Sequence, residues 1–143
     1  MVILGVDLGK SRTGISACDK QEILASPVTV IEEKNRELLC EKICAIAAER
    51  KAELIVMGLP KNMDGSEGGS AQAAREFAAK LSEASGLTVE LSDERGTTIT
   101  AHSYLNEVNV RGSKRKNTVD AVAAVIILEE YMRKRKLAAQ NNA

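Results

Sequence analysis

The chain has 143 residues and no net formal charge, a length that fits one domain with a hydrophobic core of its own. A hydrophobic fraction of 44% excludes a disordered chain, and two Tyr, one Phe and no Trp disfavour the aromatic platforms on which RNA-binding modules stack bases. Charge is unevenly spread, because residues 109–143 hold eight Lys or Arg against three acids. This part of the chain would attract a polyanion, and a solubilising charged tail explains residues 133–136 equally well.

The first third of the chain predicts three strands. Residues 2–8 form a β-branched, largely apolar run typical of a buried central strand. Residues 13–18 alternate, residues 19–22 make a turn, and residues 23–31 read as a third strand in which Pro27 favours a sheet edge. Together they predict an antiparallel meander.

The rest of the chain alternates helices with strands. We expect strands over residues 54–57 and 87–91. We expect helices over residues 35–51, capped by Asn35, 70–86, capped by Ser70 and stopped at Gly86, 97–108, and 117–137, opened by Asn117 or Thr118. Strands separated by helices require crossovers and pair in parallel. The prediction is an α/β fold with a five-stranded mixed sheet flanked by helices, in a single domain over 1–143 with a basic extension from about residue 132.

The sequence predicts a cytoplasmic protein that does not enter a membrane. It has no apolar run of 18 residues, and its first residues read as a strand without the basic start of a signal peptide. Its three cysteines are an odd number, for which reduced thiols are the default. Cys40 and Cys44 lack a nearby His or third Cys, so we expect buried small hydrophobes and no zinc site.

Two acids stand where burial makes a charge expensive. Asp7 lies inside the first apolar run, so it is expected to meet a metal or cation, or to be a strand-end Asp bonded to the next turn. Asp120 begins a helical series with Ala124, Ile127 and Leu128, the face that would pack on the sheet. A first-turn acid interacting with the helix dipole explains an acid there, but not its place on the apolar face.

A third acidic position follows the fifth strand, at Asp93 and Glu94. Carboxyl ends of parallel strands gather at one sheet edge, where sites form. Two metal ions about 4 Å apart need several shared carboxylates, which strand, helix and loop acids can supply. Alternatively, Asp93 and Arg95 form a surface ion pair.

Four segments resemble the YqgF family: GVDLGKSRTG, GLPKNMDGSEG, DERGTT and KNTVDAVAAVIIL. Members of that family are described as Holliday-junction resolvases and as nucleases that process the precursor of small-subunit ribosomal RNA. The resemblance covers residues 3–131 and implies an RNase H-like fold and phosphodiester hydrolysis that depends on Mg²⁺ or Mn²⁺. It implies Asp7, Glu94 and Asp120 as catalytic and metal-binding residues.

The chain departs from this pattern at two points. RNase H-like nucleases commonly carry an acid at the end of the fourth strand, where this chain has Gly58-Leu59-Pro60. The third carboxylate must then come from Glu94, or from Asp64 or Glu67 in the following loop. Gly96 stands where the family usually has an apolar residue, which removes no chemical group.

Substrate contacts are expected from glycine-rich and basic segments. The loop over residues 61–70 permits close backbone approach and leads into a helix start that can bind phosphate, although an ordinary flexible connector explains it too. The expected partner is nucleic acid, an RNA precursor or branched DNA, bound by a monomer or weak homodimer. The expected contacts are Lys10, Arg12, Asn62, Gly65, Ser66, Arg95, Arg111, Lys114, Arg115 and Lys116.

Two other functions compete with a nuclease. One is a non-catalytic module associated with RNA or ribosomes. The other is a phosphate-binding domain of the actin and sugar-kinase type, because Asp7-Leu8-Gly9 with Gly14 resembles that nucleotide loop. Those proteins duplicate the fold, and this chain has one copy. The sequence does not choose between DNA junctions and RNA precursors.

Overall fold

The computed structural model describes residues 1–60, 68–93 and 112–141, and residues 112–120 and 141 by their backbone alone. The helix expected over residues 97–108 lies outside these ranges. Within them, no helix is long and apolar enough to cross a membrane. In chain order the elements are β1 (Ile3–Asp7), β2 (Arg12–Cys18), β3 (Ala25–Glu32), α1 (Arg36–Glu49), β4 (Leu54–Leu59), α2 (Gly69–Ser85), β5 (Thr88–Asp93) and α4 (Gly112–Asn141).

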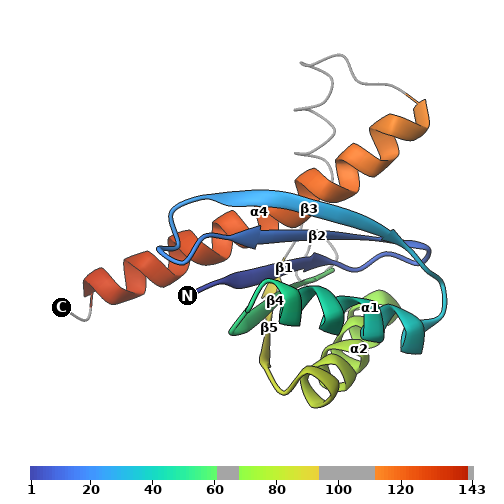
Figure 1. The fold of residues 1–143 in the computed structure, drawn as a ribbon, viewed down its shortest axis with the longest axis horizontal. Helices are drawn as coiled ribbons and strands as arrows, with labels where there is room; N and C mark the ends of the chain where they lie inside the picture. Colours follow the sequence, from blue (N-terminus) through green and yellow to red (C-terminus); the bar gives the residue numbers. More distant parts are fainter. Residues whose placement is uncertain (61–67, 94–111, 142–143) are drawn as a thin grey trace.

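The strands form one five-stranded sheet in the order β3-β2-β1-β4-β5 (Figure 1). β1 pairs antiparallel with β2, and β2 with β3, whereas β1, β4 and β5 are parallel to one another. The predicted mixed sheet is confirmed, and so is the edge position of β3, which Pro27 indicated. Because β1, β4 and β5 are parallel, their carboxyl ends meet at one edge of the sheet.

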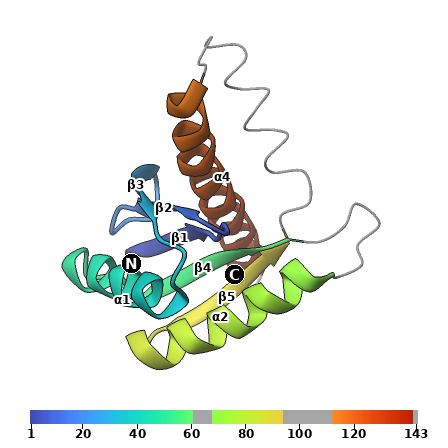
Figure 2. The same ribbon diagram turned by 90° about the vertical axis from the view of Figure 1, so that its right-hand side faces the viewer.

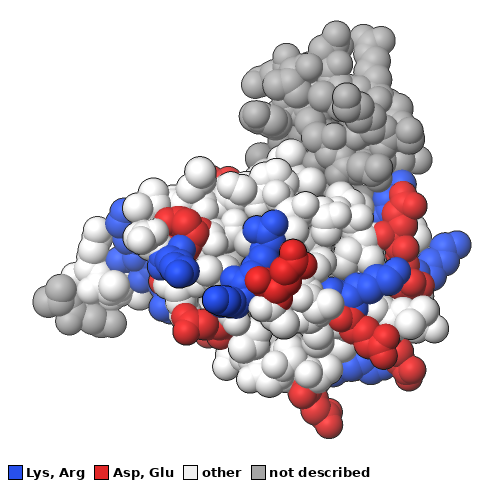
Figure 3. All heavy atoms as spheres, in the orientation of Figure 1, with Lys and Arg blue, Asp and Glu red and all other residues white. Residues whose placement is uncertain are grey.

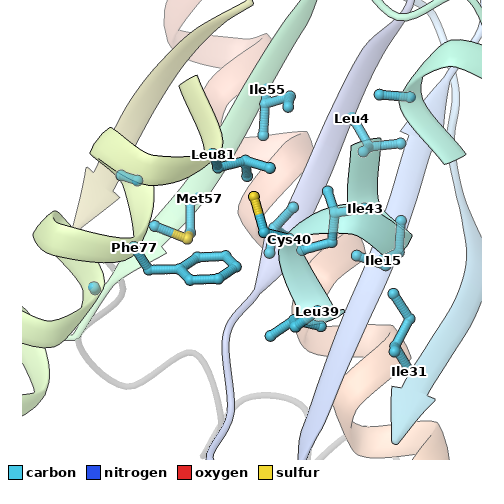
Figure 4. Close-up of a cluster of buried hydrophobic side chains, with 14 of the residues drawn as sticks. Leu4, Ile15, Ile31, Leu39, Cys40, Ile43, Ile55, Met57, Phe77 and Leu81 are labelled. Carbon is cyan, nitrogen blue, oxygen red and sulfur yellow. The ribbon is translucent and has the colours of Figure 1, made fainter. Parts of the chain in front are cut away.

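Helices cover both faces of the sheet. Figure 2 shows α4 on one side and α1 with α2 on the other. Under α1 and α2 lies the larger core, which is aliphatic apart from Phe77 and includes Cys40 as a small hydrophobe (Figure 4). Under α4 lies a smaller cluster that joins Ile127 and Leu128 to Ile3, Cys18, Leu54 and Val56.

The helix ends test the predicted caps. The Asn35 side chain accepts hydrogen bonds from the amides of Glu37 and Leu38, both at 3.0 Å, as predicted. Gly86 ends α2 with a left-handed φ of 74°, also as predicted. The cap at Ser70 is wrong: α2 begins at Gly69, and Gly68 is its N-cap without a side-chain hydrogen bond.

The last helix is longer than predicted at both ends, because α4 spans Gly112–Asn141. Lys114, Arg115 and Lys116 therefore lie in its first turns and not in a loop. These residue types have high helix propensity, and no breaker separates them from Asp120, so the helix continues through the polar pair at 117 and 118. At the other end, two alanines carry it past residue 137.

Candidate active site

Asp7 is the last residue of β1, half-buried, with Gly14 of β2 as its partner across the pair. Successive residues of a strand lie on opposite faces of the sheet, so the neighbours of Asp7 in β1 show on which face Asp7 lies. Leu4 and Val6 belong to the core under α1 and α2, whereas Ile3 packs with Ile127 and Leu128 of α4. Asp7 therefore shares the α4 face with Ile3, at the carboxyl edge of the sheet.

Asp120 lies on α4, eight residues after the helix begins. The predicted packing face is confirmed downstream of it, since Ala124, Ile127 and Leu128 are buried. α4 runs antiparallel to β1 (Figure 1): Ala124 and Leu128 lie beside Gly5, and the later residue Arg135 binds the same Glu22 carboxylate as the amino terminus. Residues earlier in the helix, Asp120 among them, thus lie toward the end of β1 that carries Asp7.

This position removes the helix-dipole explanation of Asp120. The stabilisation of an acid by the helix dipole falls off within the first turn. Asp120 is more than two turns from Gly112, so an acid at this point gains little from the helix start. The earlier expectation of a first-turn acid followed from the incorrect helix start at residue 117.

Several predicted site residues lie outside the described residues: Asn62, Asp64, Gly65, Ser66, Glu67, Glu94, Arg95 and Arg111. The side chains of Lys114, Arg115, Lys116 and Asp120 lie outside as well. Among the residues that the structure describes, no group of three His, Cys, Asp or Glu side chains could hold a metal ion. Asp93 is the last residue of β5 and lies on the same face of that strand as Val89 and Leu91, which pack against the α1 and α2 core. Asp93 therefore occupies the face of the sheet opposite Asp7.

The turn between β1 and β2 carries Lys10, which is exposed, and leads into Arg12, the half-buried first residue of β2. Its backbone is held tightly, because the Gly9 amide donates to Oγ1 of the buried Thr13 (3.4 Å) and the Glu33 amide donates to the Ser11 carbonyl (3.0 Å). A Cβ at Gly9 would lie 2.0 Å from the Arg12 carbonyl oxygen, so only glycine fits there.

Sequence reasoning missed Arg36, which supports this turn from α1. Its guanidinium donates to the Gly9 carbonyl at 2.9 Å and lies 5.9 Å from the centroid of the Phe77 ring on α2. An available signal was its position in the first turn of a helix, where the dipole disfavours a cation and some other interaction must offset it. Arg36 thus connects both helices of that face to the turn that presents Lys10.

Nearby Glu33 belongs to the start of α1. It accepts hydrogen bonds from Lys42 Nζ (3.0 Å) and from the Asn35 amide (3.1 Å). The hydrogen bond from Lys42 and that from the Asn35 backbone hold the pKa of this carboxyl below its usual value. Its role is therefore to organise the helix start beside the turn.

The start of α2 follows the glycine-rich segment. Gly68 is an N-cap without a side-chain hydrogen bond, and the first turn of α2 contains no acid. The first amides of a helix have no partner within the helix, so this end attracts anions. A Cβ at Gly68 or Gly69 would meet no atom of the described residues within 4 Å.

The opposite end of the molecule holds a hollow between the β2–β3 turn and the last turns of α4. There Arg135 Nε donates to Glu22 at 2.8 Å, and the amino terminus lies 3.2 Å from the same carboxylate. Acidic and basic side chains are interspersed on the face seen in Figure 3, so its described residues form no continuous basic track. This hollow lies far from the carboxyl edge, and its ion pairs tie the hairpin to the helix.

Solved structures of low sequence identity share this architecture. T. thermophilus RuvC in complex with a Holliday junction substrate has a TM-score of 0.61 at 13% identity, over 95% of this chain and 96% of that one. Fowlpox virus resolvase in complex with Holliday junction DNA has a TM-score of 0.59 at 9% identity, over 94% of this chain and 98% of that one. With its mixed sheet and flanking helices, the protein has the RNase H-like fold.

Sequence relatives narrow this class to one family. Residues 1–134 match the family model RuvX, described as "Holliday junction resolvase". A Clostridium botulinum (strain Eklund 17B / Type B) protein named "Putative pre-16S rRNA nuclease" is 42% identical over 132 residues, 92% of this chain and 96% of that protein. A protein of the same name from Lactococcus lactis subsp. lactis (strain IL1403) is 40% identical, over 91% of this chain and 92% of that protein. The chain belongs to the RuvX family, which is the YqgF family of the sequence motifs.

Proposed function

We propose that this chain is a nuclease that hydrolyses phosphodiester bonds at the carboxyl edge of β1, β4 and β5. The observation that carries this proposal is that β1 ends at Asp7 on the face covered by α4, the helix that contains Asp120. Two acids far apart in sequence thereby belong to the same end of the same face. Membership of the RuvX family supports the same activity.

The acidic set comprises Asp7, Glu94 and Asp120, and the metal is Mg²⁺ or Mn²⁺. Carboxylate oxygens are the ligands that these hard cations prefer, so the donor chemistry fits. When bound, the ions would activate water for in-line attack on phosphorus and neutralise the charge that develops on the phosphate. Asp93 is not part of the set, because its strand position is on the opposite face.

The protein's own groups would bind and orient the substrate backbone. Lys10 in the β1–β2 turn and Arg12 at the start of β2 would contact phosphate, and the backbone of that turn is fixed by Thr13 and Arg36. The α2 start would supply amides, together with Asn62, Gly65 and Ser66 of the loop before it. The first turns of α4 combine a helix N-terminus with Lys114, Arg115 and Lys116. In the sequence, Arg111 precedes this helix and Arg95 follows Glu94, and both would add phosphate contacts.

The substrate is nucleic acid: the 5′ end of the 16S ribosomal RNA precursor, a Holliday junction, or both. The names of the curated relatives favour the first, and the family description names the second. We further propose a cytoplasmic monomer or weak homodimer, since three free thiols suit a reducing compartment.

The test is cleavage of a labelled rRNA precursor and a labelled four-way junction, side by side, with Mg²⁺, with Mn²⁺ and with neither. We expect metal-dependent cleavage of at least one substrate by the wild type and none by Asp7→Asn. Binding of both substrates without cleavage would instead indicate a non-catalytic module. Cleavage that survives chelation of the metal would contradict the mechanism.

A further inference from the structure

Among the residues whose side chains the structure describes, one fully buried hydroxyl joins the sheet to α4. The Ser16 Oγ on β2 donates to the Ala124 carbonyl at 2.7 Å, and both residues are fully buried. Apolar packing is non-directional, and an alanine at position 16 would pack against a helix without needing a partner. A hydrogen bond is directional, so this contact favours one position of the helix along its axis.

Gly5 makes this contact possible. It is the partner of Ser16 across the β1–β2 pair. A Cβ at Gly5 would lie 2.2 Å from the Ser16 Oγ, 3.0 Å from the Ala124 carbonyl oxygen and 3.0 Å from the Leu128 Cβ. Any side chain at this position would push α4 away from the sheet or displace the hydroxyl.

The contact lies one step from each of the two acids. Asp7 is two residues beyond Gly5 on the same face of β1, a rise of about 6.6 Å. Asp120 is four residues before Ala124 on the same side of α4, a rise of about 6 Å. Since the strand and the helix are antiparallel, both steps lead toward the carboxyl edge of the sheet. The two rises are nearly equal, so Asp7 and Asp120 lie at nearly the same distance from the Ser16 contact along the two elements.

We propose that Ser16 and Gly5 are positioning residues that set the height and axial place of α4 over β1, so that Asp7 and Asp120 can bind one divalent cation together. This inference rests on the proposed function and adds two residues to it. Neither would touch the metal or the substrate. A small shift of the helix would alter carboxylate geometry, and supporting interactions of this kind typically change metal affinity or activity about 10–100-fold.

The test compares Ser16→Ala with Ser82→Ala. Ser82 on α2 also donates from Oγ to a backbone carbonyl, that of Leu87, at 2.7 Å, but on the other face of the sheet. We would measure thermal unfolding without metal, Mn²⁺ affinity by calorimetry, and kcat and KM for cleavage. Both variants should lose similar, small amounts of thermal stability. Only Ser16→Ala should weaken Mn²⁺ binding, by roughly tenfold or more, and lower kcat while KM stays constant.

Gly5→Ala provides a second test that does not depend on one variant folding well. Alone, it should lower thermal stability and Mn²⁺ affinity more than Ser16→Ala does. In the double variant the Ser16 Oγ that the new Cβ would meet is absent. The loss of stability in the double variant should therefore be smaller than the sum of the losses in the two single variants. Fully additive losses would contradict a shared contact.

Failure of this inference is distinguishable from failure of the proposed function. If Ser16→Ala matches Ser82→Ala in stability, Mn²⁺ affinity and kcat, the contact is only structural and the positioning role is overturned, while Asp7→Asn remains inactive. A wild type that binds no Mn²⁺ and cleaves nothing would overturn both.

Discussion

The two faces of the sheet are built from different residues. Under α1 and α2, large side chains such as Leu39, Ile43 and Leu81 fill a continuous apolar core. Under α4, a smaller apolar cluster includes Ile127 and Leu128. Beside it, Gly5 lets the helix come close to the sheet, and Ser16 forms a buried hydrogen bond with the Ala124 carbonyl. The first face is stabilised mainly by the apolar area that it removes from water, and small displacements of a helix change that area little. The second face adds a directional hydrogen bond, which favours one position of α4 on the sheet.

The difference between the two faces of the sheet bears on where the proposed active site lies. Gly5 and Asp7 belong to the α4 face, and α4 carries Asp120. A helix that approaches the sheet closely at a glycine and carries a directional hydrogen bond beside its apolar contacts suits side chains that must share a ligand. We therefore expect substitutions on the two faces to affect stability and activity differently.

The largest effect should come from the acids. Asp7→Asn or Asp120→Asn should reduce cleavage more than about 100-fold, because each removes a charge that would bind the metal directly. Without metal, either change should leave thermal stability equal or higher, since converging carboxylates repel one another. A cleavage assay with Mn²⁺ and metal-free thermal unfolding on the same variants check this.

Asp19→Asn is the matched control for those acids. The Asp19 carboxylate accepts hydrogen bonds from the amides of Ile23 and Leu24, both at 2.8 Å, in the β2–β3 turn. These backbone hydrogen bonds lower its pKa. Its substitution should lower stability and leave cleavage intact. A destabilised but fully active Asp120→Asn would place Asp120 in the same structural class.

The next effect belongs to the α1 and α2 face. Ile43→Ala removes a fully buried side chain and should destabilise the protein by about 2–5 kcal/mol. Cleavage per folded molecule should not change, because no proposed ligand lies on this core. Denaturant unfolding and cleavage at a temperature where the variant stays folded provide the comparison. A loss of kcat in the folded variant would show that the two faces are coupled.

A smaller effect is expected from charge. Neutralising Arg111, Lys114, Arg115 and Lys116 should weaken binding to any sequence and flatten its salt dependence, by up to about one unit of slope per lost phosphate contact. Neutralising Arg133, Lys134 and Lys136, at the far end of α4, should leave the slope nearly unchanged. Equal slopes for the first variant and the wild type would exclude phosphate contact there.

The glycine-rich segment should respond more weakly. Replacing Gly65 and Gly68 with Val should lower cleavage more than stability, because the loop is proposed to approach the substrate backbone. At Gly68 a Cβ would meet no atom of the described part of the chain within 4 Å, so no clash with that part is expected to destabilise the variant. Parallel measurements of thermal unfolding and kcat/KM test this, and equal losses in both would make the loop structural.

The smallest effect concerns alkaline pH. Burial and the hydrogen bond from the Tyr131 hydroxyl to Glu90 raise the pKa of Tyr131 to about 12. A pKa raised in the folded state contributes stability below the unfolded pKa of about 10, and that stability is lost as pH rises from 10 to 12. Tyr131→Phe should remove this part of the alkaline loss. Identical profiles for the two proteins between pH 10 and 12 would refute the link.

Much of the architecture followed from local patterns. Alternation and apolar runs predicted all five strands, and the caps at Asn35 and Gly86 were identified because their chemistry is local. Crossover helices imply parallel strands, so the sequence also predicted the edge at which Asp7 lies. The assignment of Glu94 and Asp120 to the site depends on family motifs and stays a proposal.

Tertiary structure decided what local patterns do not encode. The predicted start of α4 was wrong by several residues. Asn117 and Thr118 are residue types that favour helix caps, but here they lie inside a long helix. The bond from Arg36 to Gly9 spans 27 residues, and that from Ser16 to Ala124 spans 108. No periodic pattern or motif in the sequence predicts either hydrogen bond, because each forms only where the packing of separate elements brings one donor to one carbonyl. The sequence alone determined that β1 ends at Asp7, and the packing of α4 on β1 and β2 decided where along the sheet the part of the helix that contains Asp120 lies.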